Sequence, residues 1–176
     1  MKHLCATLLV LCSTPEIENK FIEEVKTCAI QYNSILPEPD RIPLSLVIAQ
    51  AVHESNYGKS RFAKVAKNIF GIKAISGDEY VLSLRTGKKV KKYYTWCESV
   101  EDYMELLLTS NHYKEFQKEL INQWVIDEIE VNKLVDKLDL YAEDVYYKDK
   151  IKKLIISIER KLYEWEENKR WYFFHA

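Results

Sequence analysis

Hydrophobic residues follow a helical period over most of the chain. After Pro43, five apolar residues fall in one broad arc at 100° per residue, while Leu46 and Ala49 cover the opposite side. The arc consists of Leu44, Val47, Ile48, Ala51 and Val52. This pattern predicts a helix from Pro43 to about Ser55 that is buried nearly all round.

A second helical pattern lies near the C-terminus. It predicts a long helix from about Tyr146 to Asn168 with one clear packing face. The residues of that face are Ile151, Leu154, Ile155, Ile158, Leu162 and Trp165.

Helix breakers are confined to the first half of the chain. All four prolines precede residue 44, and all four glycines lie between residues 58 and 87, so residues 88–176 should be mostly helical. A first helix is predicted from about Thr14 to Tyr32, with Pro15 at its first position, and a stiff connector, LPEPDRIP, should follow it. Shorter helices are predicted at about 60–66, 98–109, 112–122 and 126–138.

The period changes to two between Glu79 and Trp96. Alternating residues there can share one face, and RTGK supplies a Gly-containing hairpin turn. The residues of that face are Tyr80, Leu82, Leu84, Val90, Tyr94 and Trp96. The second strand is basic, which would protect a sheet edge or, alternatively, meet an anionic polymer; its lysines are Lys88, Lys89, Lys91 and Lys92. The predicted fold class is therefore mainly α (α+β), with one small β-lobe.

Composition limits the number of domains and the partners. The chain has 176 residues, 47% of them hydrophobic, which suits a single domain with one sizeable core. Lys and Arg number 26 and Asp and Glu 27, for a net charge of −1. Such a balance argues against a nucleic-acid or membrane-surface protein, and we expect a monomer without a stable membrane span.

The two ends of the chain are less regular. Residues 1–14 have a basic start and a short apolar segment, which fits either a secretory leader or a first apolar strand or helix packed on the core. The main domain would then occupy residues 15–168. The aromatic tail in residues 169–176 is expected to dock on the domain, with contact to a partner as the alternative.

Cysteines and histidines show no metal-ligand spacing. Cys5 and Cys12 would leave with a leader, and the distant Cys28 and Cys97 are expected to be small buried thiols. His53 projects away from the side of the helix that carries Glu54, so it should be structural or solvated. We therefore expect no metal site.

Glu54 is an acid at the end of a predicted buried helix. It falls at the edge of the apolar arc, beside Val47 and above Gln50. Apolar surroundings and the negative end of the helix dipole both disfavour its carboxylate, so its pKa should be raised, as a general acid requires. The alternative is a structural acid, solvated through the gap at Gly58.

Three separated segments resemble one enzyme family. PLSLVIAQAVHESNYGKSRFAKVAKNIFGIK, residues 43–73, resembles the signature of the glucosaminidase domains of glycoside hydrolase family 73, which are bacterial and phage peptidoglycan hydrolases. YYTWCESVEDYMELL and YAEDVYYKDKI are similar to two further elements of that family, in the same order. The resemblance spans about Phe21 to Ile155.

The resemblance carries expectations about fold and activity. It implies a lysozyme-like fold in which a helical domain and a small β-hairpin lobe flank a substrate groove. It also implies an endo-β-N-acetylglucosaminidase that cleaves the β-1,4 bond on the reducing side of N-acetylglucosamine in peptidoglycan glycan strands, with no metal or organic cofactor.

The family's residues can be placed on this chain by position. Glu54 matches the catalytic acid, Tyr141 matches a tyrosine that lines the site, and Asp78 or Glu79, with Glu79 preferred, would be the second carboxylate. The substrate's own acetamido group could replace that carboxylate. The expected substrate-binding residues are Ser55, Tyr57, Asn68, Phe70, Gly71 and Tyr94.

Three other functions remain open at this point. A lytic transglycosylase has a similar Glu-Ser pair but would be expected to carry a Gly-Leu-Met-Gln type stretch where this chain has NIFGIK. A wall-binding module with a dead site would bind without turnover, and a helical interaction protein would match by accident. The expected location is extracytoplasmic, at the cell wall, if the leader is real; otherwise the chain would reach the wall as a phage lysis-type protein, by another route.

Overall fold

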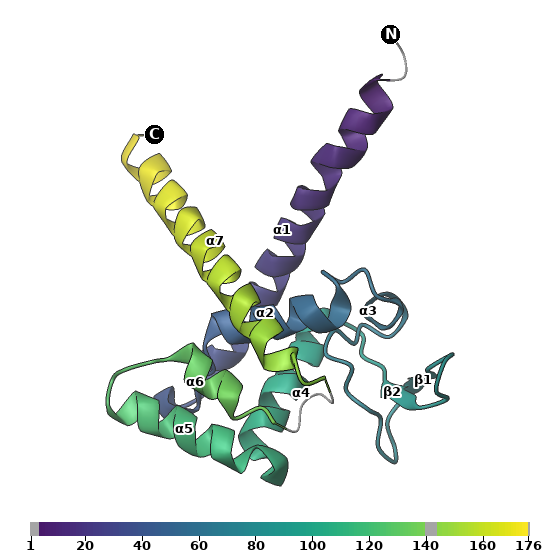
Figure 1. The fold of residues 1–176 in the computed structure, drawn as a ribbon, viewed down its shortest axis with the longest axis vertical. Coiled ribbons are helices and arrows are strands. Elements are labelled where there is room, and N and C mark those ends of the chain that lie inside the picture. The colour runs from purple at the N-terminus through teal and green to yellow at the C-terminus, as the bar shows by residue number, and fades with distance from the viewer. Residues whose placement is uncertain (1–3, 140–143, 176) are drawn as a thin grey trace.

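The computed structural model describes residues 4–139 and 144–175, with the side chains of residues 15–139 and 144–167. Two long helices, α1 and α7, diverge from a body of shorter helices, and a small β-lobe lies at one side of that body (Figure 1). In chain order the elements are α1 (Leu4–Ile35), η1 (Glu38–Asp40), α2 (Leu44–Ser55), α3 (Arg61–Val65), β1 (Tyr80–Leu82), β2 (Lys89–Lys91), α4 (Trp96–Thr109), η2 (Asn111–Tyr113), α5 (Lys114–Val125), α6 (Val131–Asp136) and α7 (Tyr147–His175).

Helix α2 forms the centre of the core, as its pattern predicts. Pro43 precedes its first turn, and the helix packs against both α1 and α7. Every residue from Ser45 to Val52 is buried, so the helix has no solvated face along that length. The helix ends at Ser55, and the next residue, Asn56, adopts a left-handed conformation with φ 51°. A buried helix that ends in this way places Glu54 at the boundary between core and surface.

Helix α1 begins earlier than the sequence indicates. It runs from Leu4, and Pro15 lies inside it rather than at its first position. A proline removes one backbone hydrogen bond from a helix interior. Here the helix continues on both sides of Pro15 despite that loss. The side chains of the first 14 residues lie outside the described part of the chain, so the leader and the packed segment both remain predictions.

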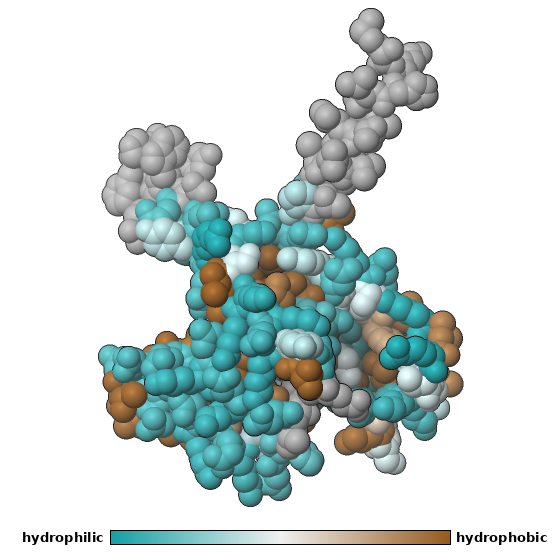
Figure 2. Space-filling model, in the orientation of Figure 1, coloured by the Kyte–Doolittle hydropathy of each residue, from teal (hydrophilic) through white to brown (hydrophobic). Residues whose placement is uncertain are grey.

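The β-lobe is smaller than predicted, and its faces differ from the prediction. Val81 pairs with Val90, so the two valines share one face while Tyr80 and Leu82 lie on the other. Val90 is 6% exposed, whereas Leu82 is 50% and Leu84 83% exposed. The predicted common face was therefore wrong, because a shift of one residue in register moves every side chain to the opposite face. Figure 2 shows the resulting hydrophobic surface over the β-lobe.

Helix α7 uses the packing face predicted for it. Ile151, Ile155 and Ile158 are buried in the core, and Leu154, Leu162 and Trp165 pack against it. The helix continues through the aromatic tail to His175, whose side chains lie outside the described part, so the predicted docking of the tail is not tested. Among the described residues, no helix is both long and apolar enough to cross a bilayer.

Cys28 and Cys97 are not free thiols. They form a disulfide that joins α1 to the first turn of α4, with 5.0 Å between the two Cα atoms. The prediction of two buried thiols was wrong because it rested on their separation of 69 residues in the sequence. Helix α1 packs against α4, so the two cysteines are adjacent in space.

Candidate active site

Glu54 lies in the last turn of α2, partly covered by the core. Burial disfavours its charged form and raises its pKa from 4.5 to about 7. A hydrogen bond from Tyr147 acts in the opposite direction and favours the carboxylate. The raised pKa predicted from the apolar arc is therefore present, so Glu54 can hold or release a proton near neutral pH.

A buried amide orients the hydroxyl that contacts Glu54. Gln50 lies one turn earlier on α2 and is fully buried, and its Nε2 donates to the Tyr147 hydroxyl at 2.7 Å. The Tyr103 hydroxyl donates to the Oε1 of the same amide. Because the Tyr147 oxygen already accepts from Gln50, its own proton is directed to Glu54. Burial raises the pKa of Tyr147, so the phenol stays a neutral donor.

His53 contacts this network from the opposite side of α2. Its ring lies edge to face on Tyr147, with 5.3 Å between centroids. Burial lowers the pKa of His53, Lys150 lowers it further, and Asp144 opposes the shift. The neutral imidazole is therefore favoured, and His53 is a structural neighbour of Tyr147, as its projection away from Glu54 suggests.

Ser55 and Gly58 shape the turn after Glu54. The Ser55 hydroxyl donates to Ala51 O at 2.6 Å and accepts from Gly58 N at 2.8 Å, and Ser55 is fully buried. Gly58 has φ 72°, and a Cβ there would lie 2.8 Å from Cη2 of Trp96. Both residues hold the backbone beside Glu54, and Ser55, expected to bind substrate, is enclosed by this turn.

Asn68 and Phe70 connect the turn after α3 to the rest of the site. Asn68 Nδ2 donates to the carbonyls of Ile72 and Lys91, both at 2.9 Å, and Oδ1 accepts from Ile72 N. This amide therefore attaches the β-lobe to the helical body. Phe70 stacks face to face on Tyr103, with 3.9 Å between centroids, and so supports the network of Glu54. Beside it, Gly71 has φ 72° and open space where a side chain would be.

The two candidate second carboxylates have different surroundings. Glu79 is exposed, its carboxylate lies 2.8 Å from Lys92, and the Tyr94 hydroxyl donates to it at 3.2 Å. The hydrogen bond from Lys92 lowers the pKa of Glu79. Asp78 accepts from Ile75 N at 2.9 Å and lies 3.7 Å from Lys91, so it closes a turn.

Two further expected residues have separate positions. Tyr57 lies edge to face on Phe21, with 6.3 Å between centroids, and Lys59 covers its ring. Tyr141 falls in residues 140–143 and lies outside the described residues, so its expected place at the site is not tested. Within the described residues, no group of three or more His, Cys, Asp or Glu could hold a metal ion.

Part of the site was not found by the sequence reasoning. Tyr147 lies in YAEDVYYKDKI, six residues after Tyr141, and Gln50 lies one turn before Glu54, so both had a local signal. Tyr103 lies in YYTWCESVEDYMELL, but its contact with Gln50 had no local signal, because only packing of α4 against the turn that carries Phe70 brings the two together.

Comparison with known proteins places the chain in a family. Residues 36–160, more than two thirds of the chain, match the glucosaminidase family, described as mannosyl-glycoprotein endo-β-N-acetylglucosaminidase. Protein bax of Escherichia coli is 32% identical over 120 residues, 66% of this chain and 42% of that protein. The exo-glucosaminidase LytG of Bacillus subtilis is 29% identical over 144 residues, 74% of this chain and 49% of that protein. The chain thus spans less than half the length of both relatives.

Solved structures share the fold. The catalytic domain of the autolysin Auto from Listeria monocytogenes matches with a TM-score of 0.62 and 25% identity, covering 89% of this chain and 94% of that one. The glycoside hydrolase domain of FlgJ from Salmonella typhimurium matches with a TM-score of 0.68 and 18% identity, covering 90% and 99%. The fold is the mainly helical, lysozyme-like one expected, and the chain belongs to the glucosaminidase family, glycoside hydrolase family 73.

Proposed function

We propose that the chain is a peptidoglycan hydrolase, an endo-β-N-acetylglucosaminidase that cleaves the β-1,4 bond on the reducing side of N-acetylglucosamine. The observation that carries this proposal is the Glu54 carboxyl, whose pKa burial raises to about 7 at the end of α2. Family membership and the autolysin and exo-glucosaminidase relatives support the substrate class.

Glu54 acts as the general acid. In its protonated form it donates to the glycosidic oxygen as the bond from that oxygen to the anomeric carbon breaks, and it is left as a carboxylate. The Tyr147 hydroxyl, directed to Glu54 by Gln50, then stabilises the new charge. The same hydrogen bond is weaker to the neutral acid, so it favours proton transfer.

The anomeric carbon needs a second group. Glu79 is the preferred candidate because Lys92 favours its ionised form, as a base or nucleophile requires. Asp78 is the second candidate, and the substrate acetamido group would make both unnecessary. Glu79→Gln and Asp78→Asn, assayed separately, test the three: a loss of turnover of at least about 10²-fold in one variant assigns the base, whereas near-normal turnover in both supports the acetamido group.

Mass analysis of fragments from purified peptidoglycan tests the proposal. Wild type should release fragments with reducing N-acetylglucosamine ends, and Glu54→Gln should lower turnover by at least about 10²-fold with the fold intact. Long fragments early in the digest support endo cleavage, and release of terminal sugars alone would support exo cleavage. Anhydro-muramyl products would assign a lytic transglycosylase, and binding without turnover would assign a wall-binding module.

The chain acts outside the cytoplasm, at the cell wall, as a monomer. The disulfide between Cys28 and Cys97 fits this location, because such bonds persist in oxidising compartments and are rare in the cytosol. Thiol labelling of the chain, denatured directly from intact cells, tests the location: peptide mapping should show Cys28 and Cys97 unlabelled until a reductant is added. Sedimentation at working concentration tests the monomer.

A further inference from the structure

A cavity of about 330 Å³ lies between α1, the turn after α3 and the residues that lead into α4. Its lining residues are Glu24, Lys67, Tyr94, Thr95 and Trp96. None of them belongs to the hydrogen-bonded network of Glu54. The volume is at the lower end of that of small-ligand sites, which begins at about 300 Å³.

The disulfide holds two walls of this cavity together. Glu24 lies one turn before Cys28 on α1, so the two side chains share a face of that helix. Trp96 directly precedes Cys97 at the start of α4. Because Cys28 and Cys97 are bonded, the backbone segments that carry Glu24 and Trp96 are held beside each other.

The indole itself has one orientation. Trp96 Nε1 donates to Ala63 O at 3.1 Å, which attaches the ring to α3. Phe21 packs on it edge to face, with 5.1 Å between centroids and 73° between planes. The ring is therefore a rigid apolar wall rather than a mobile surface side chain.

Lys67 reaches the indole from a constrained backbone. It has φ 52°, in the left-handed region that residues other than glycine rarely adopt. The neighbouring Asn68 keeps that turn in place through its hydrogen bonds to Ile72 and Lys91. Lys67 Nζ lies 6.0 Å from the centroid of the Trp96 ring, at the limit of a cation–π contact.

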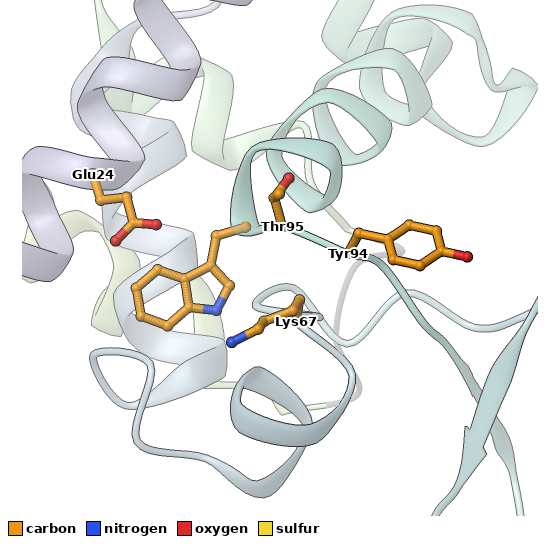
Figure 3. A pocket seen from close by; sticks show the side chains of 5 residues that line it. Glu24, Lys67, Tyr94 and Thr95 are labelled. Atoms are coloured by element: carbon orange, nitrogen blue, oxygen red, sulfur yellow. The ribbon is translucent and has the colours of Figure 1, made fainter.

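Glu24 and Lys67 carry opposite charges without an ion-pair partner among the described residues. By contrast, Glu23, which is next to Glu24, forms an ion pair with Lys26 at 3.3 Å. Figure 3 shows Glu24 extending from α1 and Lys67 from the turn toward the same space, whereas Tyr94 points away from both. The cavity thus presents an anion and a cation on either side of an indole.

We propose that this cavity binds a zwitterionic α-amino-acid centre. The ligand ammonium would pair with Glu24, its carboxylate with Lys67, and its carbon skeleton would pack against Trp96. A ligand with a single charge would meet one repelling group. A neutral sugar would leave both Glu24 and Lys67 without a partner of opposite charge, so a zwitterion fits the cavity best.

Such a centre has two sources. One is a free amino acid, and the other is a peptide of the cell wall in which a diamino acid keeps both a free amine and a free carboxylate. The second source rests on the proposed function, since it assumes that the chain meets peptidoglycan. The first does not.

Calorimetric titration with three related probes tests the site. L-norleucine carries both charges and an apolar chain, N-acetyl-L-norleucine lacks the ammonium, and L-norleucine amide lacks the carboxylate. Norleucine should bind at least about tenfold more tightly than either blocked form, because each lacks one charge-assisted hydrogen bond. Equal binding of the three, or no binding of norleucine up to about 10 mM, would overturn the proposal.

Matched variants locate the binding. Glu24→Gln and Lys67→Gln should each weaken norleucine binding by at least about tenfold. Glu23→Gln, beside Glu24 on α1, and Lys64→Gln, on α3 just before the turn of Lys67, lie outside the cavity lining and should leave it unchanged. Norleucine affinity that survives both cavity variants places the binding elsewhere and contradicts the site. These positions are partly or fully exposed, so the variants should fold.

The source is decided with the Glu54→Gln protein, in which the proposed function predicts glycan turnover at least about 10²-fold lower. A soluble wall fragment with a free amino-acid centre should compete with norleucine, and the same fragment with that amine acetylated should not. Competition assigns the wall peptide, and its absence, with norleucine binding intact, assigns a free amino acid; both outcomes support the site. If wild type shows no glycan turnover while norleucine still binds, the proposed function fails and this site stands.

Discussion

The side-chain amide of Gln50 lies 2.7 Å from the phenol oxygen of Tyr147, and this contact decides where the tyrosine proton points. The amide nitrogen donates, so the phenol oxygen is used as an acceptor and its hydrogen remains for Glu54. The amide oxygen is used in turn by Tyr103. A fully buried residue with no charge thereby sets the direction of a hydrogen bond that acts on the catalytic candidate.

Tyr147→Phe tests this direction. The hydrogen bond from Tyr147 lowers the pKa of Glu54, whereas burial raises it to about 7. In wild type, kcat/KM should therefore fall above about pH 7, where the acid loses its proton. In Tyr147→Phe this basic limb should move to higher pH, and kcat/KM at the optimum should fall by about tenfold, because the carboxylate formed in the transition state loses a donor.

Tyr146→Phe is the matched control for that variant. Tyr146 is adjacent in the chain, 66% exposed, and bonded to Asp144 only through its backbone. Its removal should change neither the pH profile nor the rate. A Tyr147→Phe enzyme with a lower rate but an unmoved basic limb would show that the tyrosine supports packing rather than the proton of Glu54.

Glu54→Gln should stabilise the fold at high pH. Between pH 4.5 and about 7 the folded chain keeps a proton on Glu54 that the unfolded chain has lost, so the free energy of unfolding falls as the pH rises through this window. Above pH 7 the folded state carries a buried carboxylate at a cost of up to about 3 kcal/mol. Glutamine has no charge and avoids this cost.

Urea unfolding of wild type and Glu54→Gln checks this prediction. The two should be equally stable near pH 4, and the glutamine variant should be more stable at pH 8. Glu164→Gln, an exposed change on α7, serves as the control and should show no such difference. Equal stability of wild type and Glu54→Gln at pH 8 would mean that burial of the Glu54 carboxylate does not lower the free energy of unfolding.

Local patterns predicted the part of the fold that determines the position and the partial burial of Glu54. The apolar arc of α2 and the packing face of α7 are periodic over many residues, so both helices and their buried faces were found from sequence. The partial burial of Glu54 was predicted for the same reason, because its position relative to that arc follows from helix geometry, whereas its catalytic role was predicted from the family resemblance.

Long-range packing explains what the sequence could not provide. The pairing of Val81 with Val90 depends on register, which alternation in a short strand does not specify. The disulfide depends on α1 lying against α4, and the contact of Tyr103 with Gln50 depends on the packing of α4. None of these has a signal within one segment.

Asn68→Ala should release the β-lobe. The side chain is 1% exposed and makes three hydrogen bonds, two to Ile72 and one to Lys91. Its loss should cost about 3 kcal/mol in the free energy of unfolding. Hydrogen exchange of residues 72–92 should accelerate more than that of α2. Asn122→Ala, an exposed change on α5, should affect neither, and uniform acceleration in Asn68→Ala would indicate global unfolding instead.

The bond between Cys28 and Cys97 should contribute substantially to stability. It closes a loop with a sequence separation of 69 residues. Chain entropy predicts a loss of about 4 kcal/mol when it is reduced. Urea unfolding with and without reductant measures this loss. A variant with both cysteines changed to serine should match the reduced wild type and should not respond to reductant; a wild type equally stable in both conditions would contradict the prediction.

Gly58→Ala and Gly71→Ala form a matched pair that isolates the contact with Trp96. Both glycines have φ 72°, so alanine strains the backbone at either position, at a cost of about 1–2 kcal/mol. At Gly71 the new Cβ meets nothing within 4 Å, whereas at Gly58 it would lie 2.8 Å from Cη2 of Trp96 and 2.9 Å from Cδ2 of Phe21.

The two variants should therefore differ in stability and in activity. Gly58→Ala should lose about 1–3 kcal/mol more than Gly71→Ala in thermal or urea unfolding, because two packed rings must move. Ser55 bonds to Gly58 N, so the same displacement should disturb the last turn of α2 and lower turnover beyond the loss of stability. Equal costs at the two glycines would show that the rings beside Gly58 yield freely, and that the turn after Glu54 is not held by them.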